Sequence, residues 1–312
     1  MIIHRGYENL NLRDPVITMG IFDGVHRGHR MLLGRVAELA GEREGDAVAV
    51  TFDPHPRLVL TGDSPELRFL TDIDERIGLL GDTGIEHLVI IRFTPELSRM
   101  TACDFLSEIL CRHLGVSHLV TGFNHHFGKR QEGTSETIME CSRRMNFSVS
   151  REEALLIDGM PVSSSGIRTL LAGGEVEKAS LLLGYEYKIT GRVVPGRKIG
   201  RALGFPTANI EPLFPHKLIP GDGVYAVRIE TEGLAGWRPG MLNIGTNPTI
   251  REGDGRRTIE AHIIDFEGDL YGRVLGIRFR FRLRDEIRFD TVEELATQMR
   301  ADLVRTVGLL GK

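Results

Sequence analysis

The chain has 312 residues, and this length favours two domains over one. Hydrophobic residues make up 41% of it, enough for ordinary globular cores, and the formal net charge of -4 gives no global reason to expect a nucleic-acid or membrane partner. Three cysteines without CxxC spacing or a histidine cluster predict neither a disulfide framework nor a zinc site, and they fit a reduced, cytoplasmic compartment. No apolar run approaches the roughly 18 residues of a membrane span, so we expect a soluble protein, whose oligomeric state the sequence leaves open.

The first chemically informative stretch lies between a predicted strand at 15–19 and a helical pattern that begins near Met31. It carries three glycines and two histidines: Gly20, Gly24, Gly28, His26 and His29. Glycines let a ligand approach the backbone closely, and the N-terminus of a helix favours an anion. We therefore predict a phosphate-binding turn with both imidazoles over one opening, although a lone HxGH turn is about as often an ordinary loop with capping histidines.

The chain then alternates between strand and helix patterns. Strands are predicted at 46–52, 87–91 and 117–122, and helices at 73–81 and about 102–114. This alternation predicts a parallel sheet that helices cover on both faces. Two prolines after the first of these strands predict an extended exit loop, which leaves Asp53 and His55 at the carboxyl end of that strand.

Two more loops in this half carry polar groups. Residues 122–130 combine glycines with aromatic, amide and basic side chains, which alone suit a solvated hairpin. Residues 162–168 place three serines and Arg168 at the start of a helical pattern, where serines are ordinary caps. Neither loop identifies a chemistry without its context.

A change of texture marks the second half of the chain. A helical pattern from Val176 ends at Gly184, as a helix with a C′ glycine does, and we place the domain boundary there. Short strands separated by Gly and Pro turns follow, at 188–194, 223–229, 241–244, 258–266 and 275–283. They predict an antiparallel barrel, and a final amphipathic helix is expected at about 292–307.

The last of these strands alternates arginines with apolar residues. The basic residues are Arg278, Arg280, Arg282 and Arg284. A basic stripe suits phosphates or nucleic acid, but strict alternation is more simply a half-buried strand with one solvated face.

Two further motifs lie in the second half. Residues 196–209 combine glycines and three bases with Thr207 and Asn209, groups that cradle phosphates and coordinate magnesium through neutral oxygens. Within 258–266, the alternation places Glu260 and His262 on one face of a strand. Taken alone, these segments are a turn entering a strand and a solvent-facing glutamate.

Together, the motifs carry a family resemblance. The string GxFDGxHxGH at 20–29 resembles the nucleotidyltransferase loop of bacterial bifunctional riboflavin kinase/FAD synthetases. Other motifs of that family follow in the same order: a GxNxxFG-type loop at 122–128, an SSTxIR-like element at 163–168 with Ser165 in place of Thr, GFPTAN at 204–209 and ExHxxDF at 260–266. This shared order over nearly the whole chain argues against coincidence.

The resemblance implies a Rossmann-like α/β FMN adenylyltransferase at 1–184 and, at 185–312, a mostly antiparallel β-barrel riboflavin kinase with a C-terminal helix. The barrel would phosphorylate riboflavin from ATP, giving FMN and ADP. The N-terminal domain would transfer AMP from a second ATP to FMN, giving FAD and diphosphate. Both steps need Mg²⁺, and the implied partners are riboflavin, FMN and ATP, with no nucleic acid or membrane.

For adenylyl transfer, the resemblance implies catalytic roles for His26, His29 and Arg168, with Arg168 meeting the leaving pyrophosphate. The residues implied to bind ATP are Gly20, Phe22, Asp23, Gly24, Gly28, Asn124, Phe127, Gly128, Ser163 and Ser164. Those implied to bind FMN are Asp53, His55 and Pro56. We also expect Asp23 to organise the turn.

For the kinase, the resemblance implies that Glu260 is the catalytic base. The residues implied to bind ATP are Gly196, Lys198, Gly200, Pro206, Thr207 and Asn209. Thr207 and Asn209 would also hold the metal ion. On the flavin side the implied residues are Asn243, Gly245 and Arg284.

Two alternatives compete with this interpretation. One is a related cytidylyl- or adenylyltransferase, since HxGH loops serve several acceptors and the fold alone does not choose among them. The GFPTAN and Glu260 motifs argue for flavin instead. The other is a flavin-sensing protein without turnover, but the motif residues keep the family pattern: His26, His29, Thr207, Asn209 and Glu260.

Overall fold

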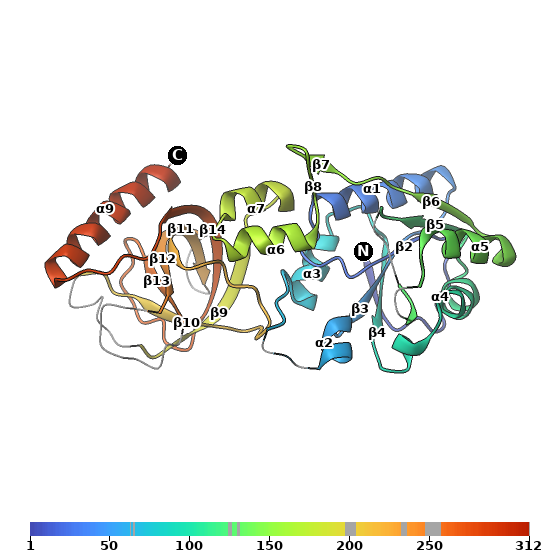
Figure 1. Ribbon diagram of the computed structural model, residues 1–312, viewed down its shortest axis with the longest axis horizontal. Helices are drawn as coiled ribbons and strands as arrows, with labels where there is room; N and C mark the ends of the chain where they lie inside the picture. Colours follow the sequence, from blue (N-terminus) through green and yellow to red (C-terminus); the bar gives the residue numbers. More distant parts are fainter. Residues whose placement is uncertain are drawn as a thin grey trace. The chain divides into compact units, whose positions relative to one another are not determined.

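The computed structural model describes residues 1–62, 64, 66–123, 127–129, 132–196, 204–231, 236–246 and 257–311. The chain forms two compact units, Met1–Ser164 and Ser165–Lys312 (Figure 1). By its contacts, α7 (Val176–Leu183) belongs to the second unit, as does α6 (Ser164–Ala172) after its first residue. The domain boundary placed after Gly184 from the sequence stays a prediction about where the two activities divide.

The first unit is built on a parallel sheet. Its strands are β1 (Ile2–Arg5), β2 (Val16–Met19), β3 (Ala47–Asp53), β4 (His87–Arg92), β5 (His118–Thr121) and β6 (Ser148–Arg151). In the described part of the chain the order is β1-β4-β3-β2-β5-β6, and every neighbouring pair is parallel. The predicted parallel sheet is confirmed, while β1 and β6 were not predicted because they are short and mostly polar or exposed.

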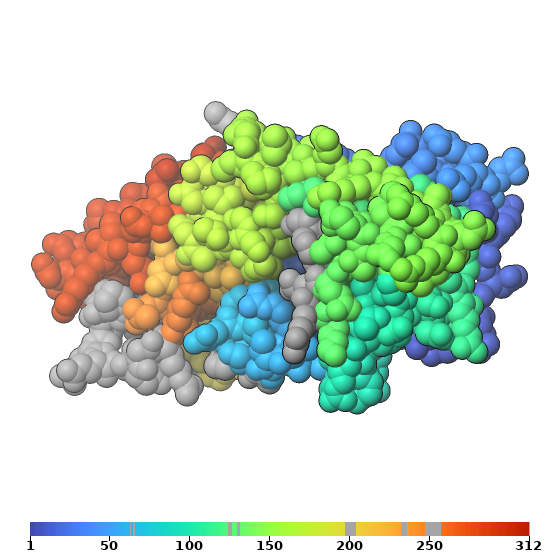
Figure 2. Space-filling model, turned by 45° about the vertical axis from the view of Figure 1, so that its right-hand side comes forward, coloured from blue at the N-terminus to red at the C-terminus, as the bar shows by residue number. Residues whose placement is uncertain are grey.

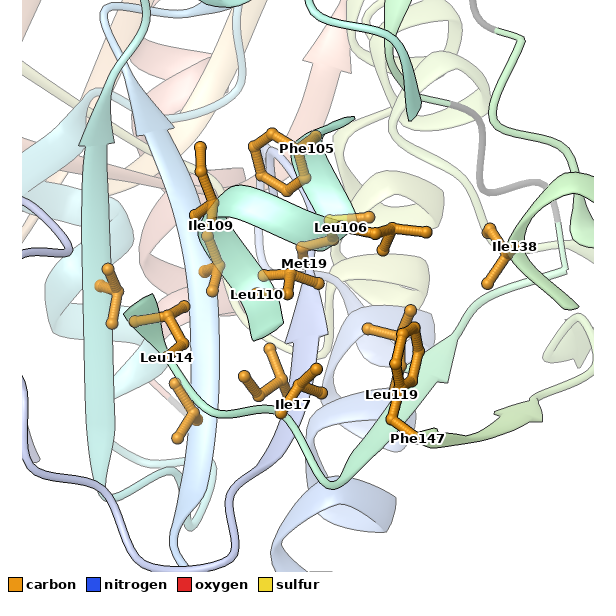
Figure 3. Close-up of a cluster of buried hydrophobic side chains, with 14 of the residues drawn as sticks. Ile17, Met19, Phe105, Leu106, Ile109, Leu110, Leu114, Leu119, Ile138 and Phe147 are labelled. Carbon is orange, nitrogen blue, oxygen red and sulfur yellow. The ribbon is translucent and has the colours of Figure 1, made fainter. Parts of the chain in front are cut away.

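Helices cover both faces of this sheet. Successive residues of a strand point to opposite faces, so Ile17 packs into one core and Val16 into the other. The first core receives α4 (Ala102–Phe105), η2 (Leu106–His113) and α5 (Ser135–Met145), and Figure 3 shows its side chains gathered on that face. The second core receives α1 (Arg27–Glu42) and α3 (Ile73–Leu80).

Two local expectations for this unit were wrong. Pro56 begins the short helix α2 (Pro56–Thr61) instead of continuing an extended loop, because the fixed φ of proline suits the first turn of a helix. Cys103 of α4 and Cys141 of α5 form a disulfide with their Cα atoms 5.8 Å apart. Spacing in the sequence could not reveal this pair, because it depends on two helices that lie side by side (Figure 1). The teal and green segments to which these helices belong also adjoin in the space-filling view (Figure 2).

The second unit is a closed antiparallel barrel. Its strands are β9 (Lys188–Val194), β10 (Ala208–Pro212), β11 (Gly223–Thr231), β12 (Arg238–Gly245), β13 (Thr258–Ile263) and β14 (Val274–Arg284). Their order among the described residues is β10-β13-β12-β11-β14-β9, and β9 pairs with β10 to close the barrel. The helix α9 (Val292–Leu310) follows.

The predicted barrel and C-terminal helix are confirmed, with two differences in the strands. β13 ends at Ile263 because the chain turns through Asp265, whose φ is 53°. β10 was not counted, since it is short and begins inside the GFPTAN motif, at Ala208. None of the helices in the described residues combines the length and the apolar composition that crossing a bilayer requires.

Candidate active sites

The glycine-rich loop lies where the strand order of the first unit reverses. β2 has β3 on one side and β5 on the other, so the connections that leave β2 and β5 diverge. In open parallel sheets, ligands bind in the crevice at the carboxyl ends of such strands. The loop from Gly20 to Gly28 follows β2, and the loop containing Phe127 follows β5. The topology therefore brings two of the predicted motifs to one edge of the sheet.

The glycine-rich loop has an unusual backbone. Phe22 and Val25 have φ of 52° and 34°, values that residues with a Cβ rarely adopt, and Gly24 has φ of 84°. Such strain persists only where the surroundings hold it, and it is typical of functional sites. Asp23 supplies one restraint, because its buried carboxylate accepts the backbone N–H groups of Leu70 and Thr71 at 2.9 and 3.0 Å. Asp23 thus organises the turn, as expected from the sequence.

The two histidines stack on each other at the start of α1. Their ring centroids are 3.6 Å apart with an interplanar angle of 13°. His26 caps the helix, since its Nδ1 accepts the backbone N–H of His29 at 3.2 Å. The proton of neutral His26 therefore lies on Nε2. Capping, the alternative considered for the lone motif, is thus compatible with ligand binding.

The charge state of His29 follows from its surroundings. Burial is the main cause that lowers the pKa of His29 well below its usual value, followed by repulsion from His26, when that ring is protonated, and from Arg76. Its Nδ1 is buried and has no hydrogen-bond partner among the described residues. The ring of Phe22 stands edge-on to the His29 ring, with 5.3 Å between the ring centroids. His29 is consequently neutral at pH 7.

The serine motif packs against the glycine-rich loop. Ser164 Oγ donates to the carbonyl of Asp23 at 2.8 Å. A Cβ on Gly28 would lie 3.5 Å from the carbonyl oxygen of Val162 and 3.3 Å from the His26 ring, so the glycine permits this approach. Two motifs far apart in sequence are thereby brought together. Arg168 lies in the second unit and donates to Ser165 Oγ at 3.1 Å, so its implied contact with pyrophosphate stays a prediction.

Phe127 and Gly128, which follow β5, pack against α4. Gly128 has φ of 76°, and a Cβ there would lie 2.8 Å from the backbone nitrogen of Ala102. The ring of Phe127 packs edge-on against Phe105 at 5.7 Å. Asn124, the residue implied to contact the nucleotide, lies outside the described residues.

The residues implied to bind FMN lie at the end of β3. Asp53 is its last residue, and His55 caps α2 by accepting the backbone N–H of Arg57 at 3.1 Å. The His55 ring stacks on Phe69 at 4.1 Å. These side chains occupy the carboxyl edge of the sheet as predicted, and their contacts with FMN stay a prediction.

One residue of this region was missed in the sequence. Arg76 of α3 is only 3% exposed, and its Nη1 donates to Thr51 Oγ1 at 3.1 Å and to the carbonyl of Phe52 at 3.2 Å. A signal was present, because position 76 falls on the same helical face as the apolar residues Ile73 and Leu80. A charged residue on an apolar face needs an explanation.

In the barrel, strand register assembles the predicted kinase residues. Glu260 of β13 stands directly opposite Asn209 of β10 and, on its other side, opposite Asn243 of β12. Opposed residues on one face have Cβ atoms about 4.5–5.5 Å apart, so these side chains are neighbours. Thr207 Oγ1 lies 3.4 Å from Glu260 Oε2. A carboxylate thus sits among one hydroxyl and two amides.

Two contacts hold the segment that carries Thr207. A Cβ on Gly196 would collide with the side-chain amide of Asn209, so a glycine is required where the amide lies against the backbone. His262 Nδ1 donates to the carbonyl of Pro206 at 2.9 Å, beside the ring of Phe205. Lys198 and Gly200, implied to bind ATP, lie outside the described residues.

The flavin-side residues have partners within the barrel. The Glu286 carboxylate fills the space where a Cβ of Gly245 would lie, and it is 3.5 Å from the Asn243 amide nitrogen. The Nε and Nη2 groups of Arg284 both donate to the carboxylate of Asp302 on α9, with Nη2 at 2.8 Å. Contact of Arg284 with flavin stays a prediction, and the structure assigns the guanidinium an ion pair that the sequence did not reveal.

The other arginines of β14 are also partnered. Arg278 lies over the Trp237 ring at 4.0 Å, Arg280 pairs with Glu186 at 2.8 Å, and Arg282 pairs with Asp285 at 2.6 Å. These contacts favour the half-buried strand over a nucleic-acid stripe.

Comparisons with known proteins match each half of the chain to a family. A family model of FAD synthetase matches residues 8–166, and one of riboflavin kinase matches residues 183–310. Relatives named bifunctional riboflavin kinase/FMN adenylyltransferase are 37% identical in Pseudomonas fluorescens and 35% in Escherichia coli K12, each over 97% of this chain and 96% of the relative. A crystal structure described as a macrolide-efflux protein from Streptococcus pneumoniae has a TM-score of 0.85 and 28% identity, covering 98% of both chains.

Proposed function

The chain belongs to the bacterial bifunctional riboflavin kinases/FMN adenylyltransferases, and on this premise we propose which residues carry each reaction. The protein phosphorylates riboflavin with ATP to give FMN, and it then adenylylates FMN to give FAD and diphosphate. Two matching domains in one chain set aside a transferase for another acceptor and a flavin sensor without turnover.

Adenylyl transfer takes place at the histidine loop. The N–H groups at the start of α1 and the Nε2–H of His26 are donors that suit the triphosphate of ATP. His29, kept neutral, stabilises charge that develops on the phosphates as a hydrogen-bond donor. The attacking phosphate of FMN has a second pKa of about 6 and is mostly dianionic at pH 7. This site therefore needs no general base.

Phosphoryl transfer takes place in the barrel beside Glu260. The ribityl hydroxyl of riboflavin must lose its proton as it attacks the γ-phosphate, and a carboxylate within hydrogen-bond reach accepts it. Glu260 is that base, and Asn209 and Asn243 on the flanking strands orient the groups around it. Its position between two amides is the observation that carries this assignment.

The barrel site also fits magnesium. Thr207 and Asn209 offer neutral oxygen ligands, and the Thr207 hydroxyl lies 3.4 Å from the Glu260 carboxylate. Such a set suits Mg²⁺, which prefers oxygen ligands and takes the remaining ones from nucleotide phosphates and water. When bound, the ion offsets negative charge on the transferred phosphoryl group. The proposed partners of the protein are its small-molecule substrates riboflavin, FMN and ATP. Because both reactions consume ATP, we also propose a cytoplasmic location.

Two variants of the full-length protein test the assignment. Glu260→Gln is nearly isosteric but cannot accept the proton, so FMN formation should fall by about 10²-fold or more while FMN-to-FAD conversion is almost unchanged. His29→Ala should do the reverse, with a loss of about 10²-fold confined to FAD formation. Initial rates are measured with riboflavin or FMN supplied separately. Equal losses in both reactions would contradict the division, and a Gln variant within a few-fold of the parent would make Asp265 the better candidate base.

A further inference from the structure

A cation is buried close to the glycine-rich loop, and no described carboxylate forms a salt bridge with it. Arg76 is 3% exposed, and its hydrogen bonds go to the Thr51 hydroxyl and the Phe52 carbonyl. Its Nε is buried and has no partner within the described part of the chain. Burying a charge costs stability unless the charge is paired, and an arginine does not escape that cost by losing its proton. The position of this residue therefore calls for a functional reason.

The contacts of Arg76 join three parts of the adenylyl-transfer site. Arg76 lies on α3, and the hydroxyl that accepts its hydrogen bond belongs to Thr51 of β3. The same hydroxyl donates to the carbonyl of Ile21, in the glycine-rich loop, at 3.3 Å. The second acceptor, the Phe52 carbonyl, directly precedes Asp53 at the end of β3. Through these hydrogen bonds, one guanidinium links the glycine-rich loop to the end of β3.

We propose that Arg76 is a positioning residue for adenylyl transfer. It anchors the glycine-rich loop through Thr51, and its charge raises the affinity of the site for the polyphosphate of ATP. The proposal rests on the assignment of adenylyl transfer to the histidine loop. It goes beyond that assignment, because Arg76 belongs to none of the motifs and contacts the loop indirectly, through Thr51.

The charge of Arg76 also reaches the reactive imidazole. A nearby cation disfavours imidazolium. After burial, repulsion from His26, when that ring is protonated, and from Arg76 lowers the pKa of His29. Three carboxylates act on Arg76 in turn, from Asp23, Asp53 and Asp72, and they partly oppose the effect of burial on its own pKa. Removal of the guanidinium should therefore move the titration of His29 to higher pH. A side chain that only fills space would not produce this signature.

Four full-length variants test the proposal. Arg76→Met removes the charge at similar size, and Arg76→Lys keeps the charge but loses the planar fork. Thr51→Val keeps the charge and removes the hydroxyl that links Arg76 to Ile21. Arg112→Met is the matched control, because Arg112 is 73% exposed in a surface pair with Glu108 of the same unit. Each variant is assayed for FMN-to-FAD and riboflavin-to-FMN conversion, and His29 is titrated by NMR.

The expected results separate charge from positioning. Arg76→Met should slow FAD formation by about 10²-fold, leave FMN formation unchanged and raise the His29 midpoint. Arg76→Lys should restore the parent midpoint and part of the rate. Thr51→Val should slow FAD formation with the midpoint unchanged, and this variant decides the matter if Arg76→Met does not fold. Arg112→Met should match the parent.

Two outcomes would overturn the proposal. In one, FAD formation stays at the parent rate in both Arg76→Met and Thr51→Val. In the other, Arg76→Met forms FAD more slowly than the parent, but Arg76→Lys restores neither the rate of FAD formation nor the midpoint of the His29 titration. That result is expected if Arg76 has a purely structural role. His29→Ala in the same assay distinguishes the premise from the proposal. If that variant also keeps the parent rate of FAD formation, the assignment of the histidine loop fails instead.

Discussion

The two candidate active sites are built from different parts of secondary structure. In the first unit, stacked neutral histidines at a helix N-terminus and a buried arginine create a site rich in donors and positive charge. In the barrel, strand register places the Glu260 carboxylate between two amides. The nucleophiles explain the difference, because the phosphate of FMN is already ionised and the hydroxyl of riboflavin is not.

The largest expected effect concerns the barrel. Asp302→Ala should lower the free energy of unfolding of the second unit by about 3–5 kcal/mol, because it leaves the guanidinium of Arg284, whose side chain is only 17% exposed, without its ion-pair partner. Unfolding is followed by the fluorescence of Trp237, the single tryptophan of the chain, which lies in this unit. Asp285→Ala is the control, since Asp285 is 81% exposed in its pair with Arg282 and should cost at most about 1 kcal/mol. Equal losses in the free energy of unfolding would contradict a stabilising role of the pair between Arg284 and Asp302.

The next effect sharpens the contrast between the sites. Gly196→Ala should reduce FMN formation by about 10²-fold, because the added methyl group displaces the Asn209 side chain beside Glu260. FAD formation from supplied FMN should be unchanged. Gly308→Ala is the matched control, since a Cβ there meets nothing within 4 Å in the same unit. Parent-like FMN formation by the Gly196 variant would show that Asn209 is not needed there.

Fragments locate the boundary between the two activities. A fragment from Tyr185 should phosphorylate riboflavin without making FAD, as the predicted boundary requires. One that begins at Ser165 should unfold at a higher temperature, because Leu171 accepts the backbone N–H of Gly221 at 2.8 Å and Glu177 accepts that of Arg282 at 3.1 Å. Activity assays and thermal melts of both fragments check this. Equal melting temperatures would contradict a structural contribution of α6 and α7 to the barrel.

The smallest expected effect is a difference in pH dependence. Burial is the main cause that lowers the pKa of His29, His118 and His4, all in the first unit. In the unfolded chain these histidines bind protons below about pH 6.5, whereas in the folded protein they stay unprotonated to lower pH. The free energy of unfolding of the first unit therefore falls as the pH drops through that value. Far-UV circular dichroism reports both units, and Trp237 fluorescence reports the barrel. Between pH 7.5 and 5.5, the first unit should lose more stability, and equal losses would refute the contrast.

The sequence by itself determined the architecture and the identity of the main motifs. β2 to β5 were predictable because they are buried on both faces and therefore read as apolar runs. The end of α7 was predictable because Gly184 adopts φ of 84°, a local requirement that glycine meets. His26, His29 and Glu260 were recognisable since each belongs to a contiguous motif.

Only the tertiary structure decided which distant residues meet. Arg76 reaches the site through Thr51, the Cys103–Cys141 pair depends on the packing of α4 against α5, and Arg284 finds Asp302 on a separate helix. No local pattern encodes these pairs, because periodicity specifies which face a side chain takes and not which element covers that face. The register that sets Glu260 between Asn209 and Asn243 likewise arises when the barrel closes, since it depends on how β13 aligns with β10 and β12.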